Sequence, residues 1–192
     1  MWLLLVLKVF SPQAAQYAKP IQAAAIKYNF DPLLIAAVVH QESRFTRRCC
    51  FRGSYGLMQV QLKPRDCKLS EERAVREGLY SPKINIMRGV RLLSFWRRWW
   101  RKNGSRSFGL RGYAAEHAYL LHYNQGFGKC PKGMRGCSWA KRTPISVGRI
   151  GGYALRVVAA YDKLLLIKSR RRAYDRYFVR EREAGSIEVG SR

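Results

Sequence analysis

One carboxylate in this chain follows a long uncharged stretch. Glu42 comes after residues 33–41, which carry no formal charge, and it is spaced by four and eight positions from Val38 and Leu34. On a helix, this spacing places the carboxyl on the same face as the aliphatic side chains. Burial and the negative end of the helix dipole both disfavour the charged form, so we expect the pKa of Glu42 to be raised. Such a carboxyl suits a general acid near neutral pH.

The other acidic residues have different surroundings. The chain holds twelve Asp and Glu residues, and apart from Glu42 they fall at a helix cap, in polar stretches, early in a helix or near the C-terminus. These residues are Asp31, Asp66, Glu71, Glu72, Glu77, Glu116, Asp162, Asp175, Glu181, Glu183 and Glu188. Glycosidases usually work with two carboxylates. If Glu42 cleaves a glycosidic bond, the substrate must therefore supply the missing nucleophile.

Other catalytic arrangements lack their characteristic residues. Ser54 follows Gly53 directly and so lies outside a G-x-S-x-G frame. His117 and His122 are five positions apart, which aligns them poorly for a shared metal on a helix, and H-E-x-x-H is missing. The five cysteines contain no C-x-x-C pair, and the sequence has no glycine-rich phosphate loop. We therefore expect neither a metal nor another cofactor.

A helix must position Glu42, and its start is marked in the sequence. Asp31 can cap the first backbone amides and Pro32 suits the first helical position, so we expect a helix from Pro32 to Glu42 or Ser43. From residue 44 to residue 55 the apolar period disappears and four arginines occur. Residues 56–62 then form a short apolar element.

Helices are predicted for most of the remaining chain. The strongest apolar period begins after Pro82 and ends at Gly104. Further helices are expected over 12–28, over 113–123, from Thr143 to 167 with glycine interruptions, and in a short segment capped by Ser70. No segment alternates convincingly as a strand. The prediction is a mainly α fold, a single helical globular domain with little or no β-structure.

Charge is the unusual property of the composition. The net charge of +25, from 37 Lys and Arg against 12 Asp and Glu, favours polyanionic partners such as anionic envelope polymers. The length of 192 residues fits one domain, which we assign to residues 13–167. Residues 1–12 would be an export signal or an N-terminal extension, and residues 168–192 a basic C-terminal tail.

The cysteines leave alternatives open. Cys130 and Cys137 flank a short loop, and Cys67 could pair with Cys49 or with Cys50, which would give two bridges and one spare thiol. Scattered free thiols in a reducing compartment are the alternative.

Five short motifs follow one another along the chain. They are Glu42-Ser43, Gly56-Leu57-Met58-Gln59, Asn85-Ile86 with Gly89 and Leu92-Leu93, Tyr123-Asn124-Gln125-Gly126, and Tyr153 followed by Val157. In this order and spacing, they resemble the catalytic domain of the soluble lytic transglycosylases over residues 13–166. The resemblance implies a fold similar to goose-type lysozyme, in the α+β lysozyme-like superfamily, with a groove for substrate.

The resemblance also implies a reaction. Glu42 would protonate the oxygen between N-acetylmuramic acid and N-acetylglucosamine, with assistance from the substrate's N-acetyl group. Glu42 would then act as a base on the C6 hydroxyl, and a 1,6-anhydro sugar would leave without consuming water. Peptidoglycan strands are then the expected partner and the cell envelope, periplasm or exterior the expected location, whereas nucleic acid is not expected as a partner.

Substrate-binding roles follow from the same resemblance. They fall on Ser43, Ser54, Met58, Gln59, Tyr123, Asn124 and Tyr153. Met58 and Gln59 would line sugar subsites, and Tyr153 would lie near the acetamido group. Tyr123 and Asn124 would position the glutamate and the sugar.

Structural alternatives stand beside these roles. Leu57 and Met58 could be core residues, and Tyr123 could be a core aromatic whose hydroxyl is satisfied. Asn85 is expected to tie the start of its helix to the core.

Two positions depart from the family pattern, and two other functions are open. The family's serine about nine residues after the glutamate is replaced by Cys50 or Phe51, so Ser54 is expected to take its place. His122 stands where a small residue usually precedes Tyr-Asn. The alternatives to a lytic transglycosylase are a hydrolytic muramidase on the same fold and a catalytically silent protein that binds the envelope or polyanions.

Overall fold

The computed structural model describes residues 2–63, 66–108, 119–120, 123 and 151–185 of the chain. Several predictions therefore lie outside the described residues. They concern Asn124, Glu116, His117, His122, the Cys130–Cys137 pair, the start of the last helix at Thr143, and most of the helix expected over 113–123.

The N-terminal part consists of consecutive helices. These are α1 (Trp2–Phe10), the 3-10 helix η1 (Pro12–Tyr17), α2 (Ala18–Tyr28) and α3 (Pro32–Ser43). Asp31 caps α3 as predicted, because its carboxylate accepts a hydrogen bond from the amide of Leu33 at 2.8 Å. The helix expected over 12–28 is divided at Tyr17 into a 3-10 helix and an α-helix.

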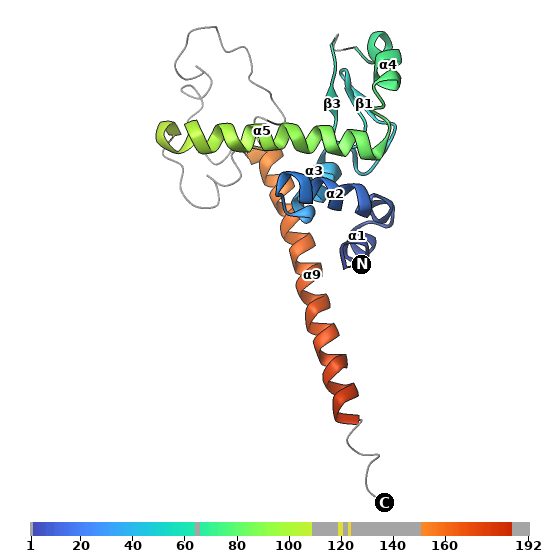
Figure 1. Cartoon of the computed structure of the whole chain (residues 1–192), viewed down its shortest axis with the longest axis vertical. Helices are drawn as coiled ribbons and strands as arrows, with labels where there is room; N and C mark the ends of the chain where they lie inside the picture. The colour runs from blue at the N-terminus through green and yellow to red at the C-terminus, as the bar shows by residue number, and fades with distance from the viewer. Residues whose placement is uncertain (1, 64–65, 109–118, 121–122, 124–150, 186–192) are drawn as a thin grey trace, which may run out of the picture.

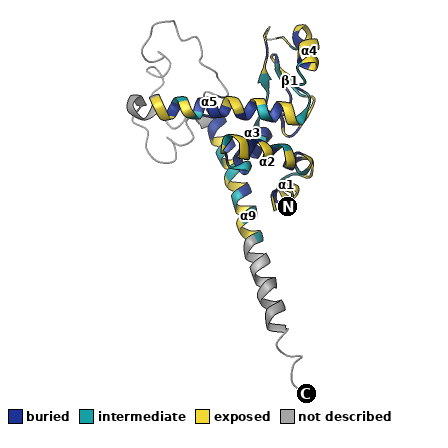
Figure 2. Cartoon of the chain, in the orientation of Figure 1, coloured by how far each residue is buried: buried dark blue, intermediate teal, exposed yellow. Residues whose placement is uncertain are grey.

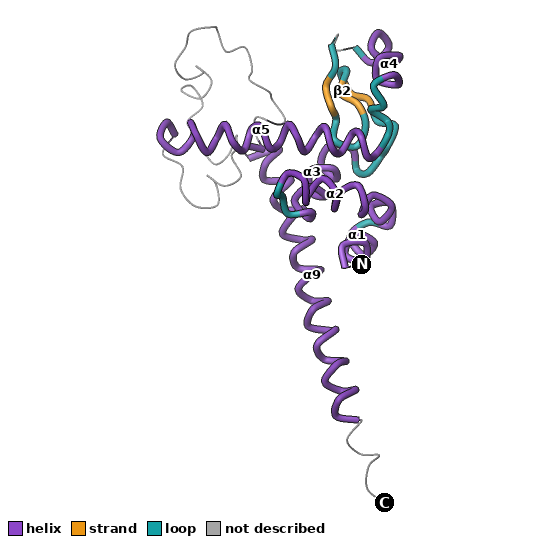
Figure 3. Tube along the Cα trace, in the orientation of Figure 1, coloured by secondary structure: helices purple, strands orange, loops and turns teal. Residues whose placement is uncertain are grey.

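A small sheet and a short helix form a separate group of elements. The strands β1 (Cys50–Phe51), β2 (Ser54–Tyr55) and β3 (Val60–Gln61) pair antiparallel in the order β1-β2-β3 (Figure 3). Helix α4 (Cys67–Arg76) lies beside them. The predicted cap at Ser70 is wrong: Asp66 caps α4, and its carboxylate accepts from the amides of Lys68 and Leu69.

Two long helices complete the described structure. Helix α5 (Pro82–Phe108) crosses the body, and α9 (Gly151–Gly185) descends from it and extends beyond the N-terminal helices (Figure 1). Helix α5 runs through Gly104, where the sequence predicted its end, because one glycine lowers helix stability by only about 1 kcal/mol. Helix α9 also continues through residue 168, so the proposed start of the basic tail is not a helix end.

The core is built around α3. Its residues 33–39 are all buried, and α3 packs against α9 and α2. Figure 2 shows the buried residues concentrated where these helices meet, below α5. The predicted mainly helical fold with little β-structure is confirmed.

One arginine joins α5 to the end of α2. Arg97 donates hydrogen bonds to the carbonyls of Tyr28 at 2.8 Å and Asn29 at 2.7 Å, and its guanidinium lies 3.7 Å from the ring centroid of Phe30. Its carbonyl partners are the otherwise unpaired acceptors at a helix C-terminus. In the described part of the chain, none of the helices combines the length and the apolar character that crossing a membrane requires.

Candidate active site

Glu42 occupies the last turn of α3 and contacts a residue far along the chain. The hydroxyl of Tyr153, at the start of α9, donates a hydrogen bond to Glu42 Oε1 at 2.5 Å. Burial raises the pKa of Glu42 to about 7, and the hydrogen bond from Tyr153 opposes this rise. The raised pKa predicted from the apolar surroundings is confirmed, whereas the tyrosine contact was missed. No local signal could reveal it, because it depends on how α3 packs against α9.

Two tyrosines lie close to this carboxyl. Tyr153 is 9% exposed, and burial followed by the charge of Glu42 raises its pKa well above the ordinary value. The pKa of Tyr123 is raised by burial and then by the charge of Glu42. The hydroxyl of Tyr123 donates to the carbonyl of Met58 at 2.7 Å. Both hydroxyls therefore stay protonated near neutral pH, and each remains a hydrogen-bond donor.

The turn over residues 56–59 is fixed by Asn85, in the first turns of α5. The side-chain amide of Asn85 donates to the carbonyls of Tyr55 and Leu79 at 2.8 Å, and its oxygen accepts from the amide of Met58 at 2.7 Å. Asn85 is 1% exposed, so the predicted structural role is confirmed. Gly56 has φ +73°, and a Cβ there would lie 2.3 Å from Asn85 Nδ2. Glycine is thus required both by the backbone conformation and by the space.

Gly89 permits a second close approach. A Cβ at this position of α5 would lie 2.5 Å from Met58 Sδ and 2.9 Å from the hydroxyl oxygen of Tyr123. The side chains of Leu57 and Met58 are almost completely buried, at 1% and 0% exposure. Both side chains are therefore core residues in this structure, and the side chain of Met58 exposes no surface that a sugar could contact.

Ser43 and Gln59 hold the turn from its other side. The buried hydroxyl of Ser43 donates a hydrogen bond to the carbonyl oxygen of Leu57 at 2.9 Å. The carbonyl oxygen of Val39 lies 3.1 Å from the same hydroxyl. The backbone of Gln59 adopts φ +47°. Its side-chain amide donates hydrogen bonds to the carbonyls of Cys49 at 3.3 Å and Gly56 at 2.9 Å. These contacts make both residues supports of the turn. Gln59 is partly exposed, so it can also reach a ligand.

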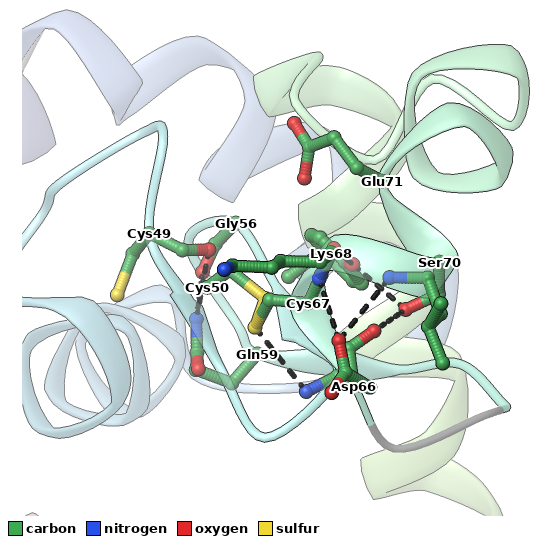
Figure 4. The surroundings of a disulfide bond; sticks show 12 residues. Cys49, Cys50, Gly56, Gln59, Asp66, Cys67, Lys68, Ser70 and Glu71 are labelled. Atoms are coloured by element: carbon green, nitrogen blue, oxygen red, sulfur yellow. Dashed lines mark hydrogen bonds between the residues drawn. A yellow bond between two sulfur atoms is a disulfide. The ribbon is translucent and has the colours of Figure 1, made fainter.

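One of the two positions that could correspond to the family's serine carries a disulfide. Cys50 is bonded to Cys67, which confirms one of the two alternatives for Cys67, and Cys49 is a free thiol (Figure 4). Ser54 is partly exposed on β2, opposite Phe51 and Gln61 in the sheet. Among the described contacts none joins Ser54 to Glu42, so its substrate role stays a prediction.

Four of the other carboxylates in the described residues are engaged elsewhere. Asp31 and Asp66 cap helices, Glu71 accepts from Tyr80, and Glu77 pairs with Arg73 and Arg88. In the same described residues, no group of three or more His, Cys, Asp or Glu side chains is arranged to hold a metal ion. Glu42 therefore remains the candidate acid–base residue of this site.

Comparison of the chain with protein families identifies the class of protein to which it belongs. Residues 19–143 match the family model described as the transglycosylase SLT domain. The match covers well over half of the chain, which therefore belongs to the SLT transglycosylase family. Tyr153, the hydrogen-bond partner of Glu42, lies beyond the matched range.

Membership in this family has direct consequences. It indicates a transglycosylase that acts on peptidoglycan, and it implies that the chain binds peptidoglycan as substrate. Enzymes of this family act on the cell wall. The Cys50–Cys67 disulfide agrees with that setting, because structural disulfides persist in oxidising compartments.

Proposed function

We propose that this protein is a lytic transglycosylase with Glu42 as its only acid–base residue. It cleaves the β-1,4 bond between N-acetylmuramic acid and N-acetylglucosamine without water, and the product carries a 1,6-anhydro sugar. The observation that carries the proposal is the buried Glu42 carboxyl with a pKa raised to about 7 and a tyrosine hydroxyl on Oε1. A carboxyl with this pKa is available in both protonation states near neutral pH.

The two steps of the reaction use the same carboxyl. Protonated Glu42 gives its proton to the glycosidic oxygen as the bond to C1 breaks, and the N-acetyl oxygen of the substrate attacks C1. The resulting Glu42 carboxylate then removes the proton from the C6 hydroxyl, and O6 displaces the N-acetyl oxygen from C1. The proton returns to Glu42, so the cycle closes without a second carboxylate.

Tyr153 has a positioning role in this scheme. Its hydrogen bond occupies Oε1 and fixes the plane of the carboxyl, so we assign proton transfer to Oε2. The same hydrogen bond favours the carboxylate, which keeps burial from raising the pKa too far for the second step. Gln59, Ser54, Tyr123 and Asn124 are the proposed substrate contacts, within a catalytic unit over residues 13–167.

The charge of the protein supports its approach to the wall. A net charge of +25 attracts anionic envelope polymers and raises the rate of encounter with an acidic matrix. We therefore place the protein in the cell envelope, periplasm or exterior. Residues 1–12 remain an export signal or N-terminal extension in this proposal, and residues 168–192 a basic tail.

A digest of purified peptidoglycan tests the proposal. The wild-type protein should release anhydro-muropeptides, and Glu42→Gln should release none while keeping its far-ultraviolet circular dichroism. Glu72→Gln is the matched control, because it makes the same substitution at an exposed position of α4, and it should retain full activity. Reducing-end products from the wild type would instead identify a hydrolytic muramidase. Binding without any sugar release would identify a silent polyanion-binding protein.

A further inference from the structure

Helix α1 lies at the surface and carries apolar side chains on both of its faces, with Lys8 as its one charged residue. Its buried face belongs to the core: Leu3, Val6 and Leu7. On its outward side, Trp2 is 40%, Leu4 is 44% and Val9 is 70% exposed. A helix that is apolar all round is normally enclosed by protein or by lipid. The outward side of α1 therefore needs an explanation that packing among the described residues does not supply.

Cations surround this apolar surface. The Nζ atom of Lys168 on α9 lies 4.7 Å from the ring centroid of Trp2, and that of Lys163 lies 5.7 Å from the ring of Phe10. Lys8 is exposed on α1 itself. We call Trp2, Leu4, Lys8, Val9, Lys163 and Lys168 the α1 face.

One acidic residue, Asp162, adjoins the α1 face in the sequence, next to Lys163, and the longer stretches on either side are free of acids. Residues 1–30 contain no Asp or Glu, and residues 163–174 contain none either. The nearest acid after α2 is Asp31, whose carboxylate accepts from the hydroxyl of Tyr161 at 2.9 Å and from the amide of Leu33. The charge of the α1 face is therefore of one sign, and it is complementary to an anionic partner.

We propose that the α1 face docks on the surface of an anionic lipid bilayer. Leu4 and Val9 enter the boundary between headgroups and acyl chains, where apolar side chains leave water. Trp2 lies at headgroup level, and the lysines extend their amines to the lipid phosphates. With nine residues, α1 is far shorter than the roughly 20 needed to span a bilayer, so it lies on the membrane.

This surface is separate from the candidate active site. Helix α1 lies at the opposite end of the body from the sheet and α4 (Figure 1). Glu42 contacts Tyr153 at the start of α9. Helix α1 instead contacts α9 near residues 163 and 168, and it reaches α3 through Phe10, whose ring centroid lies 5.0 Å from that of His40. Docking would hold the protein at the membrane while the sheet and α4 point away from it. The inference does not depend on the proposed cleavage reaction, but it requires that residues 1–12 are a retained N-terminal extension and not a removed export signal.

Co-sedimentation of the full chain with lipid vesicles tests the proposal. Vesicles of phosphatidylglycerol mixed with phosphatidylcholine are compared with pure phosphatidylcholine at physiological salt. The wild type should partition onto the anionic vesicles, and the double variant Leu4→Glu with Val9→Glu should lower the partition coefficient by roughly tenfold or more. The matched control is Ile26→Glu with Val75→Glu, at exposed positions of α2 and α4, which adds the same charge and should lose much less.

A second double variant distinguishes a loss of vesicle binding from misfolding of α1. Lys163→Gln with Lys168→Gln adds no charge to α1 and should weaken binding to the anionic vesicles severalfold. Cleavage of soluble glycan strands should be unchanged in every variant, because the α1 face lies away from Glu42. The proposal would be overturned if the α1-face variants and the control bound the vesicles equally well, or if the wild type did not bind the anionic vesicles.

Analytical ultracentrifugation tests whether the face instead binds a second copy of the chain. If the α1-face variants dissociate a dimer of the wild type and leave vesicle binding unchanged, the proposal is wrong.

Discussion

The hydroxyl of Tyr153 donates a 2.5 Å hydrogen bond to Glu42 across 111 positions of the chain. The contact joins the last turn of α3 to the start of α9, so the surroundings of the Glu42 carboxyl depend on the packing of these two helices. It also opposes the effect of burial on the pKa of Glu42. Both consequences can be measured.

Replacing Tyr153 should move the pH profile of the enzyme. Tyr153→Phe removes a hydrogen bond that favours the carboxylate, so the pKa of Glu42 should rise above its value of about 7. Because the protonated acid starts the reaction, the alkaline limb of kcat/KM should shift to higher pH. The optimum rate should fall on the order of tenfold, since a hydrogen bond to a charged group is lost.

Tyr161→Phe is the matched control for this change. It removes another hydrogen bond between a tyrosine of α9 and a carboxylate near α3, that of Asp31. We expect it to lower stability modestly and to leave the alkaline limb where it is. An equal shift in both variants would mean that helix packing, and not the contact with Glu42, sets the profile.

Glu42 should make the protein less stable as the pH rises. Its pKa is raised from 4.5 to about 7, so between these values the folded state keeps a proton that the unfolded state has released. The free energy of unfolding therefore falls with pH across this window. Glu42→Gln cannot ionise and should be more stable than the wild type above pH 7 by roughly 3 kcal/mol, the energy of the pKa difference.

Urea unfolding of both proteins at several pH values measures this effect. Below pH 4.5 the two curves should coincide, because Glu42 is then protonated in both states of the wild type. Glu72→Gln should follow the wild type at every pH. A constant difference between wild type and Glu42→Gln over the whole range would disprove the linkage.

Gly89→Ala should lower stability, which is the reverse of its usual effect in a helix. Alanine in place of glycine within a helix ordinarily stabilises by up to about 1 kcal/mol. Here the new Cβ would lie 2.5 Å from Met58 Sδ and 2.9 Å from the hydroxyl oxygen of Tyr123, so side chains must move. We expect a net loss of about 1–3 kcal/mol in urea unfolding, together with lower activity. A stabilised variant would show that the approach of α5 to Met58 is looser than described.

Loss of the Cys50–Cys67 disulfide should weaken both the fold and the turn at 56–59. The bridge spans 17 positions, and a loop of this length corresponds to about 3 kcal/mol. The carbonyl of the neighbouring Cys49 accepts hydrogen bonds from the backbone amide of Gly56 at 2.7 Å and from the side chain of Gln59 (Figure 4). Greater freedom of Cys50 without the bridge should therefore also disturb the turn. Cys50→Ser with Cys67→Ser should lower the melting temperature and the activity. Cys49→Ser, which leaves the bridge intact, should keep most of both.

The sequence predicted local features well and long-range contacts poorly. The cap at Asp31 and the burial beside Glu42 follow from residues close in sequence, and both appear in the structure. The structural role of Asn85 was also predicted, and its side chain accepts from the amide of Met58. By contrast, the partner of Glu42 depends on α3 packing against α9, for which no local pattern exists.

The short strands illustrate a second limit. Each strand has two residues, so no alternation of apolar and polar side chains can develop. The left-handed conformation of Gln59 is likewise imposed by its contacts, since glutamine has no local preference for it. Asp66, and not Ser70, caps α4 because the helix begins four residues earlier than its polarity suggested.

Incorporation of heavy oxygen tests the central claim most directly. Purified peptidoglycan is digested by the protein in water enriched in ¹⁸O, and the new saccharide ends are analysed by mass spectrometry. If Glu42 acts alone and O6 closes on C1, the products should be lighter than their hydrolytic counterparts by one water and should contain no ¹⁸O. Reducing ends that carry ¹⁸O would show that water attacks C1, and they would contradict the account.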